Sequence, residues 1–186
     1  MVAAPAWVGR SRCVGVREIF AQHALVRSHA IERLGMSTFE PQDPDFEARV
    51  RASFARQKVM ETIGANLTKV APGEVEIELP FRDDLTQHHG YLHAGIVTSI
   101  VDTACGFAAM TLMPADASVL TIEYKANFVS PAAGKRMIAR GRVTKPGRTV
   151  TVCAGDVFAL SGGKEKLVAT MLATMMAVRE RPDLPA

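Results

Sequence analysis

Residues 93–114 read HAGIVTSIVDTACGFAAMTLMP, and Asp102 is the only acidic or basic residue in this stretch apart from His93. The apolar residues run around every side of a helix, and a helix of that kind is buried. An ionised carboxylate in apolar surroundings is costly unless it is paired or its pKa moves, so a chain that keeps one there commonly uses it. The stretch therefore predicts a buried helix that carries one functional carboxylate.

The segments before this helix predict one amphipathic helix and two strands. Residues 45–63 carry apolar side chains, Val59 among them, at roughly helical spacing, and Gly64 is a natural stop for a helix. Residues 66–71 and 74–80 read as short strands on either side of a Pro-Gly turn.

Four more strands are expected after the buried helix. In the first of them, strict alternation places Thr121 and Glu123 on the same face. Consecutive strands joined by hairpins make an antiparallel sheet, and a helix that is apolar all round needs cover on every side. We therefore predict an α+β fold in which a curved antiparallel sheet wraps around a central helix, with a second copy of the chain covering what one copy leaves exposed. The four expected strands are residues 119–129, 136–144, 149–160 and 166–178.

Composition excludes several classes of protein. Of 186 residues, 48% are hydrophobic and 22% are charged, which fits one soluble globular domain. The formal net charge of +3 comes from residues 1–35, which hold five arginines and two glutamates, so the charge of the body does not indicate a nucleic-acid binder. Cys13, Cys105 and Cys153 are odd in number and far apart, which argues against disulfides and zinc and favours a reducing, cytoplasmic compartment. No segment predicts a membrane span.

The chain is expected to have three parts. Residues 1–44 form an N-terminal extension, residues 45–178 the folded domain, and residues 179–186 a loose tail. Because residues 1–35 are rich in arginine and show no sustained periodicity, we interpret them as flexible or as an over-long start that precedes the true one at Met36. A mitochondrial transit peptide is the alternative interpretation.

The loop before the buried helix supplies further candidate site residues at informative spacing. Gln87 lies six residues before His93, and His93 lies nine residues before Asp102. Nine residues of α-helix turn through about 900°, half a turn out of phase, and rise about 13.5 Å. His93 and Asp102 of one chain therefore cannot meet, but two antiparallel helices related by a two-fold axis could join them. The spacing thus predicts a composite site at a dimer interface, with two sites per dimer.

The segment 87–95, QHHGYLHAG, together with Asp102, resembles a known family. It is similar to the hotdog-fold acyl-CoA thioesterases of the phenylacetate-pathway (PaaI-type) branch of the 4-hydroxybenzoyl-CoA thioesterase superfamily. The family pattern is Asn or Gln, then Gly three residues on, then His-Gly-Gly, then an acid nine residues after the His. The resemblance extends over residues 64–178 and includes TIEYKANFVSPA at residues 121–132 and Gly-Arg-Thr at residues 147–149.

One position departs from the family pattern. Ala94 stands where the family has the middle glycine of His-Gly-Gly. Alanine keeps the backbone N–H that this position contributes, but it narrows the space beside the thioester carbonyl. We therefore expect activity to be retained and acyl preference to be altered.

The resemblance implies hydrolysis of acyl-CoA thioesters to the free acid and coenzyme A. Such a reaction needs a nucleophile or general base and donors for the developing oxyanion. The substrate itself carries coenzyme A, so neither a cofactor nor a metal is expected, and the partners expected are a homodimer and a dimer of dimers. The expected roles are Asp102 as nucleophile or base, Ala94 and Gly95 as N–H donors, Gln87 to orient water or the carboxylate, His93 to hold the loop or contact the thioester, and Thr121 to bond the water or Asp102.

Three arginines are candidates for the coenzyme A phosphates, and several alternatives stay open. Arg140, Arg142 and Arg148 could instead form an ordinary solvated face. Asp102 could be a structural acid paired with a hydroxyl of the same helix, namely Thr98, Ser99 or Thr103. The domain could also bind acyl-CoA without hydrolysing it, as a sensing module, or serve as a purely structural dimer. His88, His89 and His93 have no fourth ligand at a suitable spacing for a metal.

Overall fold

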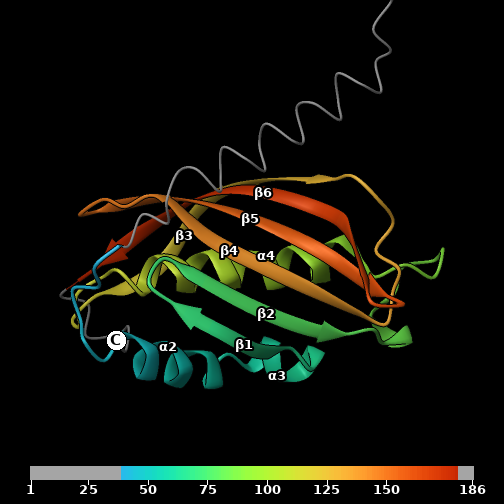
Figure 1. Ribbon diagram of the computed structural model, residues 1–186, viewed down its shortest axis with the longest axis horizontal. Coiled ribbons are helices and arrows are strands. Elements are labelled where there is room, and N and C mark those ends of the chain that lie inside the picture. Colours follow the sequence, from blue (N-terminus) through green and yellow to red (C-terminus); the bar gives the residue numbers. More distant parts are fainter. Residues whose placement is uncertain (1–38, 180–186) are drawn as a thin grey trace, which may run out of the picture. The chain divides into compact units, whose positions relative to one another are not determined.

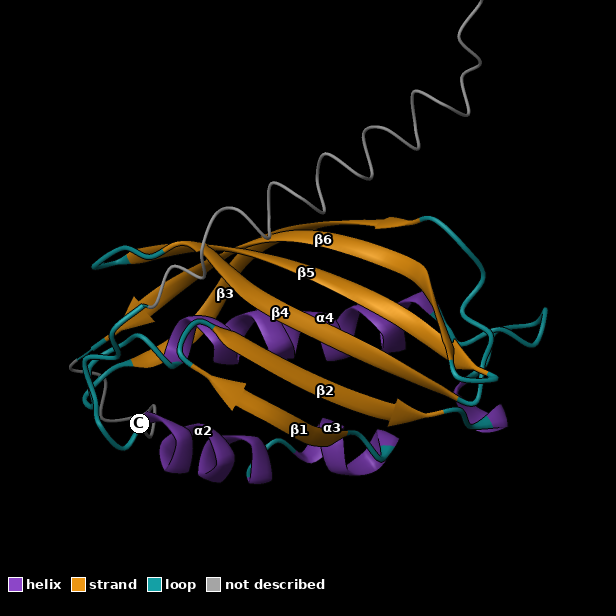
Figure 2. Cartoon of the chain, in the orientation of Figure 1, coloured by secondary structure: helices purple, strands orange, loops and turns teal. Residues whose placement is uncertain are grey.

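Six antiparallel strands form one curved sheet in the order β1-β2-β4-β5-β6-β3, and a long helix, α4, packs against one face of it (Figures 1 and 2). The computed structural model describes residues 39–179. The predicted extension therefore lies outside the described residues except for 39–44, and so does the predicted tail except for Arg179. The elements are α2 Phe46–Ala55, α3 Lys58–Ile63, β1 Asn66–Ala71, β2 Glu74–Pro80, the 3₁₀ turn η1 Asp83–Leu85, α4 Ala94–Met110, β3 Ser118–Phe128, β4 Arg136–Lys145, β5 Val150–Ser161 and β6 Lys164–Val178.

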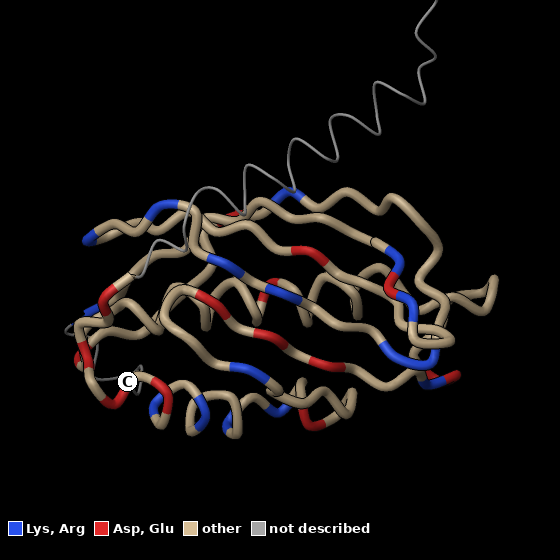
Figure 3. Tube along the Cα trace, in the orientation of Figure 1, with Lys and Arg blue, Asp and Glu red and all other residues tan. Residues whose placement is uncertain are grey.

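Helix α4 is the buried helix that the sequence predicts, although it ends at Met110 rather than near residue 114. It contacts five of the six strands, and every residue from Ala104 to Met110 is buried. Asp102 is its only charged residue, whereas charged residues are spread along α2 and the strands, the central strand β4 included (Figure 3). The predicted fold class, a curved antiparallel sheet around a central helix, is confirmed. Within residues 39–179, no helix combines the length and the hydropathy needed to span a bilayer.

Two glycines allow α4 to approach the sheet closely. Gly141 of β4 and Gly155 of β5 are Cα partners in the ladder between these strands. A Cβ atom at Gly141 would overlap the backbone of Ala104 and Cys105, and a Cβ atom at Gly155 would overlap the side chains of Val101 and Cys105. The paired glycines thus form the groove that fixes the height of α4, and of Asp102, above the sheet.

Gly141→Ala is expected to destabilise the fold by about 3 kcal/mol, because the added methyl group meets helix backbone that cannot rotate away. Urea denaturation gives the free energy of unfolding. Thr144→Ala, at an exposed position of the same strand, serves as the control and is expected to change stability by about 0.5 kcal/mol or less. Equal midpoints for the two variants would show that α4 does not sit in this groove.

The prediction of one helix over residues 45–63 is wrong, because α2 and α3 meet at a break. Gln57 has φ −78° and ψ 94°, which is extended backbone. In one continuous helix, Ile63 would point about 140° away from Val50, yet both residues are buried. Val59, which the pattern places on the apolar face, is 52% exposed. The break therefore turns the second helix so that both apolar surfaces reach the core.

A β-bulge in β3 decides which face Thr121 takes. The register places Thr121 opposite Met175 and Glu123 opposite Thr174, and it shifts between these two pairs. Met175 is fully buried, whereas Thr174 donates its hydroxyl to the Glu123 carboxylate at 3.0 Å on the exposed face. The prediction that Thr121 and Glu123 share a face is therefore wrong. The extra residue, Ile122, turns Thr121 toward α4.

Arg49 of α2 holds the C-terminal end of α4. Its guanidinium donates to the carbonyl oxygens of Met110 at 3.0 Å, Met113 at 2.8 Å and Pro114 at 2.6 Å, and it lies 3.0 Å from the Asp43 carboxylate. The last carbonyl groups of a helix have no partners within it and carry partial negative charge, which a cation satisfies. The far end of α4 is thereby tied to α2.

Candidate active site

Asp102 lies on α4 opposite the bulge of β3, where it meets Thr121. The Thr121 hydroxyl donates to Oδ1 of Asp102 at 2.9 Å and also lies 3.5 Å from the sulfur of Met175. Burial raises the pKa of Asp102 above the ordinary range of an aspartate, and the hydrogen bond from Thr121 opposes that rise. A carboxylate in this setting is suited to accept a proton.

The hydroxyl groups of α4 do not pair with Asp102. Thr98 donates to the carbonyl oxygens of Ala94 and Gly95, and Ser99 donates to that of Gly95. Thr103 donates to the side-chain oxygen of Gln57, which lies outside the helix. Among the described residues, the alternative of a structural acid held by its own helix is therefore wrong. The partner of Asp102 comes from β3 instead.

A pocket opens beside the Asp102 carboxylate. Its wall includes Gln57, which stands at the break between α2 and α3 and whose Oε1 accepts a hydrogen bond of 3.4 Å from the Thr103 hydroxyl. Gln57 could not be predicted from the sequence, because neither proline nor glycine marks the break. The residues lining the pocket are Gln57, Asp102, Thr103, Gly106, Phe107, Val119 and Thr121.

The N-terminus of α4 is capped by His93. Nδ1 of His93 accepts a hydrogen bond of 2.9 Å from the backbone N–H of Gly95. A Cβ atom at Gly95 would lie 3.1 Å from the same nitrogen, so a glycine suits this position. Of the two N–H groups expected to polarise a carbonyl, that of Gly95 is thus occupied by His93. The N–H of Ala94 donates no hydrogen bond within residues 39–179.

The loop before α4 is a closed turn in which Gln87 takes part. Its backbone N–H donates to the Tyr91 carbonyl at 2.8 Å, and its carbonyl accepts from Gly90 at 2.9 Å. Gly90 has φ +79°, in the left-handed region that favours glycine. The side-chain oxygen of Gln87 accepts a hydrogen bond from the N–H of His89. The amide oxygen therefore holds the loop, which leaves the amide NH₂ group to face other partners.

The structure separates the predicted site residues into two groups. Gln87, His93, Ala94 and Gly95 lie at the start of α4, and Asp102 lies with Thr121 near its middle. Nine helical residues between His93 and Asp102 correspond to about 13.5 Å along the axis. One chain therefore does not bring the two groups together.

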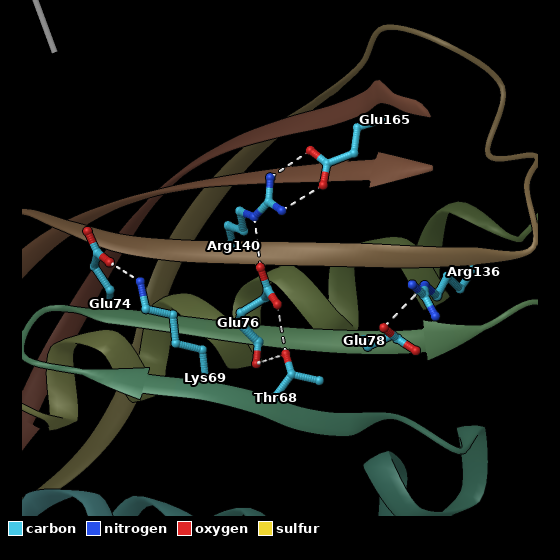
Figure 4. Close-up of polar contacts among 8 residues, drawn as sticks. All are labelled: Thr68, Lys69, Glu74, Glu76, Glu78, Arg136, Arg140 and Glu165. Carbon is cyan, nitrogen blue, oxygen red and sulfur yellow. Dashed lines mark hydrogen bonds and ion pairs between the residues drawn. The ribbon is translucent and has the colours of Figure 1, made fainter. Parts of the chain in front are cut away.

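The predicted arginines lie apart from both groups. Arg140 donates to Glu76 at 2.8 Å and to both oxygens of Glu165 at 2.7 and 2.8 Å, on the face of the sheet that points away from α4 (Figure 4). Arg142 donates to Asp156 at 2.7 Å. These two residues form the ion-paired, solvated face that the sequence left open as an alternative. Arg148, in the turn between β4 and β5, is exposed and forms no ion pair among the described residues.

Thr121→Val is expected to move the acid limb of the pH profile of kcat/KM to higher pH. A general base at Asp102, one of the two roles expected from the sequence, works as the carboxylate, so activity is lost as the pH falls through the pKa of Asp102. Removing the hydroxyl removes a hydrogen bond that lowers this pKa, so the loss begins at higher pH. Thr174→Val, which removes a hydroxyl donor to a carboxylate on the opposite face, is the control. An unmoved acid limb in Thr121→Val would contradict the role of this contact.

Comparison with known proteins identifies relatives of the whole domain. Residues 89–166 match the family model described as "Thioesterase superfamily". A candidate esterase of Saccharolobus solfataricus is 30% identical over 133 residues, which cover 72% of this chain and 86% of that protein. The crystal structure of a thioesterase family protein from Silicibacter pomeroyi has 50% identity and a TM-score of 0.71, covering 72% of this chain and 98% of that one. A structure from Ralstonia eutropha, described as a candidate thioesterase related to phenylacetic acid degradation, has 25% identity and a TM-score of 0.62, covering 70% and 98%.

Proposed function

Because this chain belongs to the thioesterase superfamily, whose hotdog fold it shares, we propose that it hydrolyses acyl-CoA thioesters at a site built by two copies of the chain. The observation that carries the proposal is Asp102, the one charged residue of the buried helix, set in a pocket with Thr121 as its hydrogen-bond partner. A half-buried carboxylate of raised pKa beside an open pocket is suited to act as a general base.

In the proposed reaction, Asp102 takes a proton from a water molecule that attacks the carbonyl carbon of the thioester. The carbonyl oxygen becomes an oxyanion. The N–H of Ala94 at the start of α4, which has no acceptor in the described part of the chain, is the donor suited to it. The bond between carbon and sulfur then breaks, and coenzyme A leaves as the thiol once its sulfur has gained the proton. Direct attack by the Asp102 carboxylate is the other form of the same proposal.

The second copy is needed because one chain keeps Asp102 and Ala94 apart. Strand β3 pairs with β6 on one side only and stands at the edge of the sheet. Large apolar side chains along this edge are 44–52% exposed, and a long apolar edge strand is normally covered. Since Thr121 of β3 contacts Asp102, a copy that covers β3 comes close to the Asp102 pocket. The exposed residues are Leu120, Ile122, Tyr124, Phe128 and Val129.

Contact with the coenzyme A part of the substrate is proposed for Arg148. Its guanidinium is exposed and is not engaged by a carboxylate among residues 39–179. Arg140 and Arg142, in contrast, already bind carboxylates on the other face of the sheet. A planar guanidinium binds phosphate oxygens in a bidentate manner, which suits the phosphates of coenzyme A.

A panel of acyl-CoA thioesters tests the proposal, with release of the free thiol followed in a colour reaction. We expect turnover of at least one acyl-CoA and none of the matching thioethers, which lack a cleavable ester-like carbonyl. Binding of acyl-CoA without release of thiol by any member of the panel would contradict hydrolysis and would favour a sensing module instead.

A further inference from the structure

Two recesses adjoin along α4, and only the first contains Asp102. The second lies between α2, the C-terminal half of α4 and the start of β3. It begins beside the first recess and continues toward Met110, which lies eight residues beyond Asp102, or about 12 Å along the helix axis. Its lining residues are Ser53, Arg56, Gln57, Phe107, Met110, Ser118 and Val119.

Three residues are common to both recesses, one from each wall. Gln57 comes from the break between α2 and α3, Phe107 from α4, and Val119 from β3. Together these three residues form a waist, where the recess that contains Asp102 adjoins the second recess. Whatever passes from one recess into the other passes between their side chains.

Gln57 is the adjustable member of this waist. Phe107 is 5% exposed and packs against the ring of Phe54, with centroids 6.2 Å apart. Val119 is fixed in the ladder between β3 and β6. The backbone of Gln57 is also fixed, because its N–H donates to Phe54 at 3.0 Å and its carbonyl accepts from Met60 at 3.0 Å. Among residues 39–179, its side chain is held by a single bond, the 3.4 Å bond from Thr103.

We propose that the second recess receives the far end of the acyl group and that Gln57 determines which acyl groups can enter it. This inference rests on the proposed function, since the thioester carbonyl must lie at Asp102. An acyl group extending from that point along α4 meets Gln57, Phe107 and Val119 before it reaches Met110. Phe107, Met110 and Val119 give the recess an apolar side for the chain, beside a polar side that contains Ser53 and Arg56. An acetyl group is too short to pass the waist. Gln57 is thus a specificity-determining residue for acyl groups longer than acetyl.

Two substitutions at Gln57 give opposite predictions. Gln57→Ala opens the waist and is expected to raise the ratio of kcat/KM for octanoyl-CoA to that for acetyl-CoA by about tenfold. Gln57→Trp closes the waist and is expected to lower the same ratio by about tenfold. Lys58→Ala, at the next residue and with its side chain 85% exposed, is the control that should leave the ratio unchanged.

Binding of thioethers keeps the inference separate from the proposed function. The affinities of octyl-CoA and ethyl-CoA thioethers, measured by calorimetry, report on the recess without any turnover. If the wild-type chain hydrolyses no thioester, the proposed function fails, but a tenfold change in the octyl-to-ethyl affinity ratio in Gln57→Ala still supports the recess. If neither the octanoyl-to-acetyl kcat/KM ratio nor the octyl-to-ethyl affinity ratio changes in folded Gln57→Ala and Gln57→Trp, Gln57 does not determine acyl length and the inference is overturned.

Discussion

Asp102→Asn is expected to lower kcat for acyl-CoA hydrolysis by about 10²-fold or more, with the fold intact. The amide has nearly the same shape as the carboxylate and can still accept the hydrogen bond from Thr121. It cannot, however, take a proton from water or attack the thioester. Because burial raises the pKa of Asp102, the neutral amide costs the fold little. The free energy of unfolding should therefore stay close to that of the wild type, and kcat should carry the effect.

Glu123→Gln provides the matched control for this experiment. Glu123 lies on the same strand as Thr121, across the bulge and on the opposite face, where it binds Thr174. Neutralising it removes one carboxylate from the same region of the surface without touching the pocket. We expect kcat for Glu123→Gln to remain within about twofold of the wild type. If kcat for Asp102→Asn is also near the wild-type value, the assignment of Asp102 as base or nucleophile is contradicted.

The sequence predicted the architecture well because its main determinants are local. The stretch around Asp102 is apolar on all sides, so it had to be covered. The strands on either side show alternation and tight turns, and β1 and β2 begin and end at the predicted residues. Gly64, predicted to stop a helix, has φ +77° and ends α3. Each of these features depends on neighbours within a few residues.

The parts that sequence reasoning missed depend on tertiary contacts. The break at Gln57 contains neither proline nor glycine, and it exists because Val50 and Ile63 must both reach the core. The bulge at Ile122 follows from the register between β3 and β6, which alternation within one strand does not reveal. The consequence for the site is direct. Asp102 could be chosen from the sequence, but neither the face of Thr121 nor the presence of Gln57 in the pocket could be predicted.

The central claim is that each working site combines the start of α4 from one chain with the middle of α4 from another. Two inactive chains are therefore expected to complement each other. One chain carries Gln87→Ala and His93→Ala, which damage the loop and the helix cap, and the other carries Asp102→Ala, which removes the carboxylate. In a heterodimer, one site then contains only wild-type residues, and the other contains all three substitutions.

Thiol release from an equal mixture of the two chains, after subunit exchange is verified by mass spectrometry, tests this claim most directly. Random exchange makes half of the dimers heterodimers, each with one intact site of two, so we expect about a quarter of the wild-type activity. Each chain alone should remain near background. If exchange is complete and the mixture is no more active than the separate chains, the two-chain site is contradicted.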